Sequence, residues 1–223
     1  NQIELRVIAH LAEDPGLIEA FSTGQDIHST TAARIFGVEP GDVSVEQRSK
    51  SKMVSYGLAY GMEAYGLGQR LNIPTAEAQE ILNAYFEAFP SVKAFMEHTV
   101  AEARDRGYTE TVFGRRRRIP ELSSGQRNVR MAGERQAMNA PIQGLAADIF
   151  KVALVRLDAA ISERGLASNL ILQVHDEVLV EVPHGELDAA TDAVIFAMSG
   201  AFDLRVPLEV NLSHGASWAA AKG

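Results

Sequence analysis

The sequence contains no cysteine, and it has no apolar run long enough to cross a membrane. Without cysteine, neither a disulfide framework nor a thiolate metal site can form. Without such a run no membrane-spanning helix is expected, and the first residues lack the pattern of a secretory signal peptide. Apolar and charged contents are otherwise ordinary, so these absences predict a globular protein of the cytosol.

Positive charge is scarce as well, because 21 Lys and Arg stand against 29 Asp and Glu, for a formal net charge of −8. This balance argues against a nucleic-acid partner, since affinity for a polyanion comes mainly from Lys and Arg that neutralise phosphates. The local distribution matters more than the sum. Residues 115–118 are all arginine, in a turn framed by Gly114 and Pro120, which favours phosphate contact over a targeting signal or a solvated loop. Further arginines follow at Arg127, Arg130 and Arg135.

Periodicity and helix-boundary residues predict an α+β fold that is mostly helical, with short strands near its end. Ser44 and Gln47 have the spacing of a capping box, so a long helix is expected from there to about Ala59. Thr75 is expected to cap a helix that ends near Phe89. The other predicted helices span about 2–11, 15–21, 26–36, 90–106, 126–164 and 186–198, with hairpins at 108–119 and 170–182 and a final strand at 208–212.

Residues 47–61, with the sequence QRSKSKMVSYGLAYG, place two cations and two phenols at a repeated spacing of four. Each four-residue step on an α-helix drifts only about 40° around the axis, so these side chains share one face. Cations on such a face suit the phosphates of a nucleoside triphosphate, and an aromatic ring suits its base. A solvated basic helix would show a similar pattern. The residues concerned are Arg48, Lys52, Tyr56 and Tyr60.

Residues 170–182 contain two apolar, β-branched runs around the polar tip His175, Asp176 and Glu177. This pattern predicts a hairpin that presents acids at its turn. Hard cations such as Mg²⁺ take carboxylate oxygens, and phosphoryl-transfer sites hold them with one or two protein carboxylates. An ordinary polar turn is the competing interpretation.

Together these segments resemble the family A DNA polymerases. Residues 1–6 resemble the latter part of the family's motif A, residues 48–61 its motif B and residues 173–177 its motif C. Residues 26–28 and 135–144 are also similar to family segments, in the family's order. Several motifs in the right order are a strong signal, where a lone Arg-x-x-x-Lys would be weak.

The resemblance implies a mostly helical fingers subdomain inserted in a discontinuous palm that has a short antiparallel sheet. Residues 1–12 are then expected to belong to the palm, 13–125 to the fingers and a connecting hairpin, and 126–223 to the palm, with no thumb or exonuclease domain in this chain. The essential first aspartate of motif A would lie two residues before Asn1, outside this sequence. At the position of Asn1 itself, family members usually have serine. We therefore expect a C-terminal fragment that works with upstream polymerase segments in the same or a companion chain.

The activity implied is template-directed transfer of deoxynucleotides to a primer 3′ hydroxyl, with two Mg²⁺ ions or Mn²⁺ as their substitute. Asp176 and Glu177 are the expected metal ligands. Glu177 is the weaker candidate, because adjacent strand residues point to opposite faces. Lys52 is expected to contact the triphosphate near the scissile bond and to protonate the leaving pyrophosphate. Primer-template DNA and deoxynucleoside triphosphates are the expected partners, and the bacterial cytoplasm, at the nucleoid, is the expected location.

The resemblance also assigns the remaining nucleotide contacts. Arg48 and His28 are expected to neutralise the outer phosphates. Tyr56 is expected to pack on the sugar and base, and a tyrosine at this position implies tolerance of dideoxynucleotides. Glu4 is expected to act as a steric gate, occupying the space that a ribose 2′ hydroxyl would need.

DNA contacts are expected from three places. Tyr60 is expected either to stack on the template or to pair with Glu4. His175 is expected to orient the primer end or the turn, because imidazole prefers metals softer than Mg²⁺. A set on one helix is expected to check base-pair geometry through the minor groove, whose acceptors are nearly independent of sequence. This set is Arg135, Asn139 and Gln143.

Two other interpretations stay open at this point. The chain can be a catalytically inactive remnant that still binds primer-template DNA. It can also be an unrelated metal-dependent hydrolase that uses Asp176 and Glu177, although this leaves the spacing of Arg48, Lys52 and Tyr56 unexplained. Preference for the templated triphosphate separates a polymerase from both.

Overall fold

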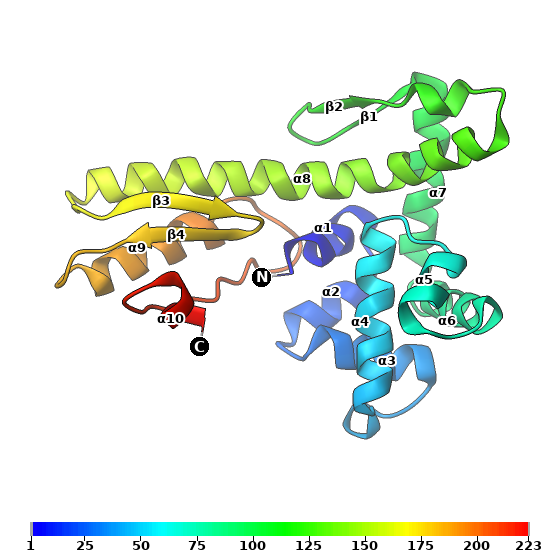
Figure 1. Cartoon of the computed structure of the whole chain (residues 1–223), viewed down its shortest axis with the longest axis horizontal. Helices are drawn as coiled ribbons and strands as arrows, with labels where there is room; N and C mark the ends of the chain where they lie inside the picture. Colours follow the sequence, from blue (N-terminus) through cyan, green and yellow to red (C-terminus); the bar gives the residue numbers. More distant parts are fainter. Residues whose placement is uncertain (1, 223) are drawn as a thin grey trace. The chain divides into compact units, whose positions relative to one another are not determined.

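The computed structural model describes residues 2–222, which divide into two compact units. The larger unit comprises residues 4–145, and the smaller one comprises residues 2–3 and 146–222. Helices dominate both units, and the strands of the described residues form two antiparallel hairpins (Figure 1). The predicted fold class, mostly helical α+β, is confirmed. None of the described helices is long and apolar enough to span a bilayer.

The larger unit consists mainly of helices, several of which begin or end at a recognisable capping residue. Asp14 caps α2 and Asp26 caps α3 through side-chain oxygens, and Gly107 ends α7 with a left-handed φ of 77°. The elements are α1 (Ile3–Ala12), α2 (Pro15–Ser22), α3 (Ile27–Phe36), η1 (Pro40–Asp42), α4 (Val45–Ala59), α5 (Ala64–Leu71), α6 (Thr75–Ala88), α7 (Pro90–Arg106), β1 (Tyr108–Glu110), β2 (Arg116–Arg118), η2 (Pro120–Ser123) and the first part of α8 (Arg127–Glu163).

Helix α4 begins at the predicted capping box. The Ser44 hydroxyl accepts a hydrogen bond from the Gln47 backbone N–H at 3.1 Å, and the Gln47 side chain accepts one from the Ser44 N–H at 2.9 Å. Both bonds satisfy N–H groups that a helix start would otherwise leave unpaired. Val54 and Leu58 are buried on the inner face of the helix, which packs on α3 and α6. The long helix is therefore confirmed, with its apolar side turned inward.

Helix α5 was not expected from the sequence, because glycines at 66 and 68 lower its helix propensity. Gly68 has a packing reason, since a Cβ there would lie 3.0 Å from the Ile73 carbonyl oxygen. The expected cap of α6 is wrong. Thr75 is the first residue of that helix, and Pro74 holds the capping position without a side-chain hydrogen bond. Proline fits this boundary because its fixed φ leads into the first turn.

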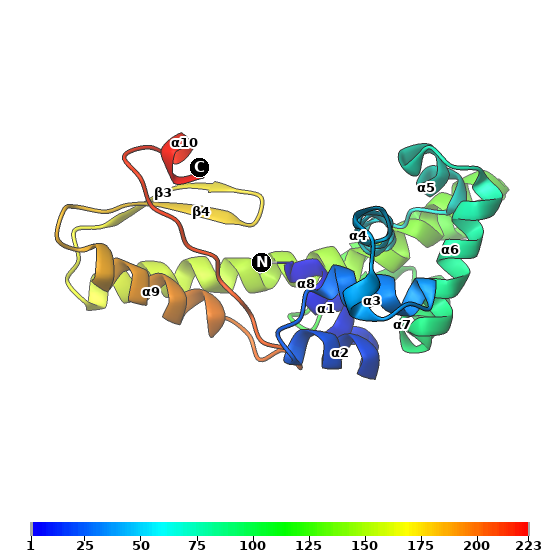
Figure 2. The ribbon, with the colours of Figure 1, turned by 90° about the horizontal axis from the view of Figure 1, so that it is seen from below.

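The smaller unit contains the end of α8, the hairpin of β3 (Asn169–Val174) and β4 (Glu177–Glu181), α9 (Leu187–Ser199) and α10 (Trp218–Lys222). Helix α9 lies beside the end of α8 in both ribbon views (Figures 1 and 2). Small residues on α9 allow this close approach. The core consists of Leu157, Ala160, Ile161, Ala193, Val194 and Ala197, with Leu170, Val178 and Val180 packed on it from the hairpin.

The predicted final strand at 208–212 is wrong. These residues have no ladder partner among the described residues, and β3 and β4 pair only with each other. Val210 still packs on the core of the smaller unit. Packing on the core does not make the segment a strand, because a strand also needs a neighbour for its N–H and C=O groups.

Candidate functional site

Helix α4 presents the predicted cations to solvent. Arg48 and Lys52 are exposed, and Tyr56 is half-buried on the same face. Tyr60 follows the last turn and is 55% exposed. The ammonium group of Lys52 makes no ion pair with any residue from 2 to 222. This face therefore offers positive charge to an anion in solvent.

His28 lies next to this face, on α3. Its side chain is only 3% exposed, and its ring centroid is 5.7 Å from that of Tyr56. Burial lowers the pKa of the imidazole, the charge of Asp26 opposes this, and the charges of Arg48 and Lys52 add to it. Nδ1 has no hydrogen-bond partner in the described part of the chain. The structure thus joins His28 to Tyr56 and leaves a buried polar atom that a ligand could satisfy.

Arg48 is held by Asp26 in a two-point ion pair. Arg48 Nε is 2.6 Å from Asp26 Oδ2, and Nη2 is 3.2 Å from Oδ1. Burial raises the pKa of the Asp26 carboxyl, but hydrogen bonds from Arg48 and Ser29 and the charge of Arg48 lower it more, so the net pKa is well below its usual range. Asp26 is therefore ionised at neutral pH, and this contact was not predicted from the sequence.

Glu4 and Tyr60 meet at the end of α4. The Tyr60 hydroxyl donates a hydrogen bond to Glu4 Oε1 at 3.1 Å, which links α4 to α1. Of the two arrangements expected for Tyr60, pairing with Glu4 is the one observed. The contact orients a carboxylate beside the cationic face without burying either group.

The predicted DNA contacts on α8 turn toward the segment that follows Tyr60. Arg135 Nη1 is 3.1 Å from Glu63 Oε1. Asn139 packs against Gly61, where a Cβ would lie 2.7 Å from the Asn139 amide nitrogen. Gly61 also has a φ of 67°, a left-handed conformation that favours glycine. Gln143 is half-buried one turn further along. The sequence did not predict the ion pair between Arg135 and Glu63, because the two residues are far apart in the chain.

The acidic tip lies in the smaller unit, at the turn between β3 and β4. Val174 pairs with Glu177, so His175 and Asp176 form a two-residue loop. His175 has a φ of 55°, a left-handed conformation that costs about 1–2 kcal/mol for a residue with a Cβ. The Gln173 amide donates a hydrogen bond to the His175 carbonyl at 2.7 Å, which supports the turn. Asp176 is thereby displayed to solvent at the hairpin tip.

Glu177 has a partner that the sequence did not indicate. Its Oε2 is 3.0 Å from Lys222 Nζ, and Lys222 also lies over the Trp218 ring at 4.9 Å. Among residues 2–222 no three His, Asp or Glu side chains cluster in a way that could hold a metal. The carboxylates at this tip that could hold a metal ion are those of Asp176 and Glu177. This set suits Mg²⁺, which commonly takes one or two carboxylates and completes its shell with water and substrate phosphates.

Comparison with known proteins covers nearly the whole chain. Residues 1–220 match the family model described as DNA polymerase family A. DNA polymerase I of Mycobacterium tuberculosis is 53% identical over 221 residues, which cover 99% of this chain and 24% of that protein. DNA polymerase I of Streptococcus pneumoniae is 46% identical over 223 residues, which cover 100% of this chain and 25% of that protein. The chain thus spans about a quarter of the length of these curated relatives.

A solved structure shares the fold. It is the POL domain of Pol1 from M. smegmatis in complex with DNA primer-template and dNTP. The match has a TM-score of 0.95 at 52% sequence identity and covers 100% of this chain and 39% of that one.

Proposed function

Because the chain belongs to DNA polymerase family A, we propose that it catalyses template-directed transfer of deoxynucleotides to a primer 3′ hydroxyl, acting with segments that correspond to the rest of its relatives. The observation that carries the proposal is the exposed cationic face of α4, with Tyr56 beside the buried ring of His28. The relative of known structure, which was solved with primer-template and dNTP, supports it. Residues 13–125 are then the fingers and a connecting hairpin, and residues 1–12 and 126–223 belong to the palm.

In this proposal the α4 face binds the incoming nucleotide. Arg48 and Lys52 neutralise the triphosphate, and His28 Nδ1 supplies a hydrogen bond at its outer end. Tyr56 packs on the sugar and base. The Lys52 ammonium group donates a proton to the leaving pyrophosphate. Glu4, held by Tyr60, excludes a ribose 2′ hydroxyl.

Asp176 and Glu177 are the residues that would hold Mg²⁺, with Mn²⁺ as a substitute. When bound, the metal neutralises phosphate charge and activates the attacking hydroxyl, as in two-metal phosphoryl transfer. Asp176 is the principal ligand, because its carboxylate is exposed at the tip while Glu177 Oε2 is paired with Lys222. Both proposed ligands are carboxylates, the ligand type that Mg²⁺ prefers, so the site needs no imidazole or thiolate.

The proposed DNA contacts come from α8, from the turn between β3 and β4, and from Tyr60. Arg135, Asn139 and Gln143 contact the base pair nearest the reaction through its minor groove. His175, whose backbone conformation is strained, orients the primer end. Tyr60 borders the template side. Since the relatives are bacterial polymerases, the protein is expected to act in the bacterial cytoplasm, at the nucleoid.

Single-nucleotide primer extension tests the proposal. The longest polypeptide that carries this sequence is assayed with Mg²⁺ beside its Asp176→Ala variant. The matched control is Glu181→Gln, which removes an exposed carboxylate at the other end of the hairpin. Extension should fall at least about a hundredfold in Asp176→Ala, since a metal ligand supplies several kcal/mol to the transition state. The control should keep wild-type activity.

Three results would each contradict the proposal. Equal extension by wild type and Asp176→Ala means that this carboxylate holds no essential metal. Primer-template binding without extension, and without preference for the templated triphosphate, identifies an inactive remnant. Triphosphate hydrolysis that needs no template identifies a hydrolase.

A further inference from the structure

The Asp26 carboxylate joins two helices. On its own helix it caps α3, accepting hydrogen bonds from the N–H groups of His28 at 3.4 Å and Ser29 at 3.3 Å and from the Ser29 hydroxyl at 2.6 Å. On α4 it accepts the two hydrogen bonds from Arg48. Helices α3 and α4 pack against each other within the larger unit (Figure 1). One carboxylate therefore fixes the start of α3, which carries His28, relative to the guanidinium on α4.

The geometry leaves the outer part of the guanidinium available. The ion pair uses one N–H of Nε and one of Nη2, so the other three of the five have no hydrogen-bond partner among residues 2–222. Arg48 is 46% exposed and Asp26 is 38% exposed. The pair thus orients the Arg48 head group and still presents donors to solvent.

We propose that Asp26 is a positioning residue of the nucleotide site, holding Arg48 and the start of α3 as one preformed binding unit for a triphosphate. This inference rests on the proposed function, because it takes Arg48 as a triphosphate contact. Without the ion pair, binding would have to order a long side chain that has many rotamers. Ordering a binding group beforehand increases affinity by removing that cost.

The Asp26 carboxylate could also lower the affinity for a triphosphate, since two negative groups that lie close together repel each other. Two features limit the repulsion. The carboxylate is already neutralised by Arg48, and its oxygens are turned to the donors of α3 and Arg48. Both groups are partly exposed, so solvent and salt screen the remaining field. Preorganisation is therefore the larger effect of Asp26.

The test separates capping from positioning. Asp26→Asn keeps a good N-cap residue, so α3 should still begin normally. The variant loses the charge that holds the guanidinium. Arg48→Ala removes the group that is positioned, and the double variant completes a thermodynamic cycle. The measurements are kcat and KM for the templated dNTP in single-nucleotide extension, and the equilibrium Kd of the same dNTP by calorimetry.

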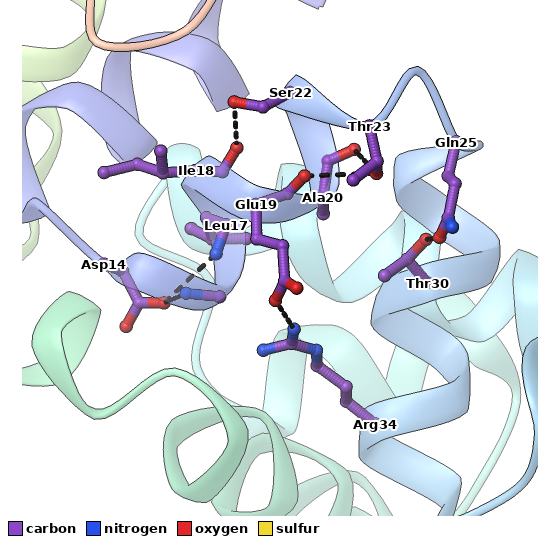
Figure 3. A network of polar contacts seen from close by, with 11 residues as sticks. Asp14, Leu17, Ile18, Glu19, Ala20, Ser22, Thr23, Gln25, Thr30 and Arg34 are labelled. Carbon is purple, nitrogen blue, oxygen red and sulfur yellow. Dashed lines mark hydrogen bonds and ion pairs between the residues drawn. The ribbon is translucent and has the colours of Figure 1, made fainter.

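A matched control is offered by Glu19 on α2, which pairs with the same helix, α3. Glu19 Oε2 pairs with Arg34 Nη2 of α3 at 3.0 Å (Figure 3). Glu19→Gln makes the same change in charge and also removes an exposed ion pair from α3. It does not touch Arg48, so it should leave KM and Kd unchanged within twofold.

For Asp26→Asn we expect KM and Kd to rise about three- to tenfold, with kcat within twofold of the wild type. In the Arg48→Ala background the same substitution should add no more than a further twofold. Unchanged or lower KM and Kd in Asp26→Asn, a loss confined to kcat, or an equal rise in the Arg48→Ala background would each overturn the inference. If Arg48→Ala itself leaves the dNTP affinity unchanged, the proposed nucleotide site fails and the inference fails with it.

Discussion

The Tyr60 phenol and the Glu4 carboxylate are joined by a hydrogen bond of 3.1 Å, although 56 positions separate them in the sequence. The bond connects the first turn of α1 with the residue that follows α4. Each residue belongs to a segment that resembles a different polymerase motif, so the contact brings two motifs together. A carboxylate held in one orientation can exclude a neighbouring hydroxyl better than one that rotates freely.

The first prediction concerns this gate. Glu4→Ala should raise ribonucleotide incorporation relative to deoxynucleotide incorporation at least about tenfold, because the 2′ hydroxyl gains room. Tyr60→Phe should change the same ratio less, since the carboxylate stays but loses its donor. The measurement is the ratio of kcat/KM for a matched ribonucleotide and deoxynucleotide pair. Glu80→Ala, an exposed glutamate on α6, is the control, and an equal ratio in Glu4→Ala and Glu80→Ala would contradict the gate.

The second prediction concerns the Tyr56 phenol. If this hydroxyl replaces the missing 3′ hydroxyl of a dideoxynucleotide, Tyr56→Phe should discriminate against dideoxynucleotides at least about fivefold more strongly than the wild type. One hydrogen bond of about 1 kcal/mol accounts for that factor. Competition between a dNTP and its dideoxy analogue in single-nucleotide extension measures it. Tyr65→Phe, which alters an exposed phenol on α5, should match the wild type. Equal discrimination by the wild type and Tyr56→Phe would refute the role.

Local chemistry predicted those elements whose signals lie within a few residues. The capping box of Ser44 and Gln47 is such a case, because the side chains that make it are three positions apart. Gly107 is another, since only a left-handed residue was needed to end α7. Helix α5 escaped prediction because its glycines lower helix propensity, while Gly68 fits against α6, where a Cβ would lie 3.6 Å from the Ala78 side chain. Tertiary packing there overrides propensity.

In the candidate site, too, the sequence predicted local arrangements but not contacts between separate helices. Residue types and spacing predicted that Arg48 and Lys52 share one helix face, and the structure bears this out. The partners of these groups could not be predicted, because pairs such as Asp26 with Arg48 depend on how separate helices pack. The partner of Glu177 likewise comes from α10, which no sequence pattern connected with the hairpin.

The third prediction concerns the stability of α4. Ser44→Ala removes the side-chain acceptor of the capping box and should lower the free energy of unfolding by about 1 kcal/mol. Urea unfolding at neutral pH measures the change. Ser49→Ala is the control, because Ser49 is exposed within the same helix and alanine is the better helix former. Ser49→Ala should leave stability unchanged or raise it slightly, and equal losses in both variants would contradict the capping role.

The fourth prediction concerns the pH dependence contributed by Asp26. The folded-state pKa of Asp26 lies below its ordinary value of 3.8, so the folded state favours the ionised carboxyl. Such a group stabilises the fold above the unfolded pKa, and its contribution is lost as the pH falls toward the folded pKa. At pH 7 the wild type should exceed Asp26→Asn in free energy of unfolding by up to about 1 kcal/mol, the range of a partly exposed ion pair.

That difference should stay constant from pH 7 to about pH 5 and shrink below about pH 4, where the unfolded carboxyl becomes protonated. Arg48 keeps its charge throughout, so it adds no titration of its own. Urea unfolding of the wild type and Asp26→Asn at several pH values measures the difference directly, because all other carboxyl groups are common to both proteins. Ser44→Ala removes no charge, so its difference from the wild type should not vary with pH. A difference for Asp26→Asn that persists unchanged at pH 3, or grows there, would show that the ion pair does not lower the pKa of Asp26.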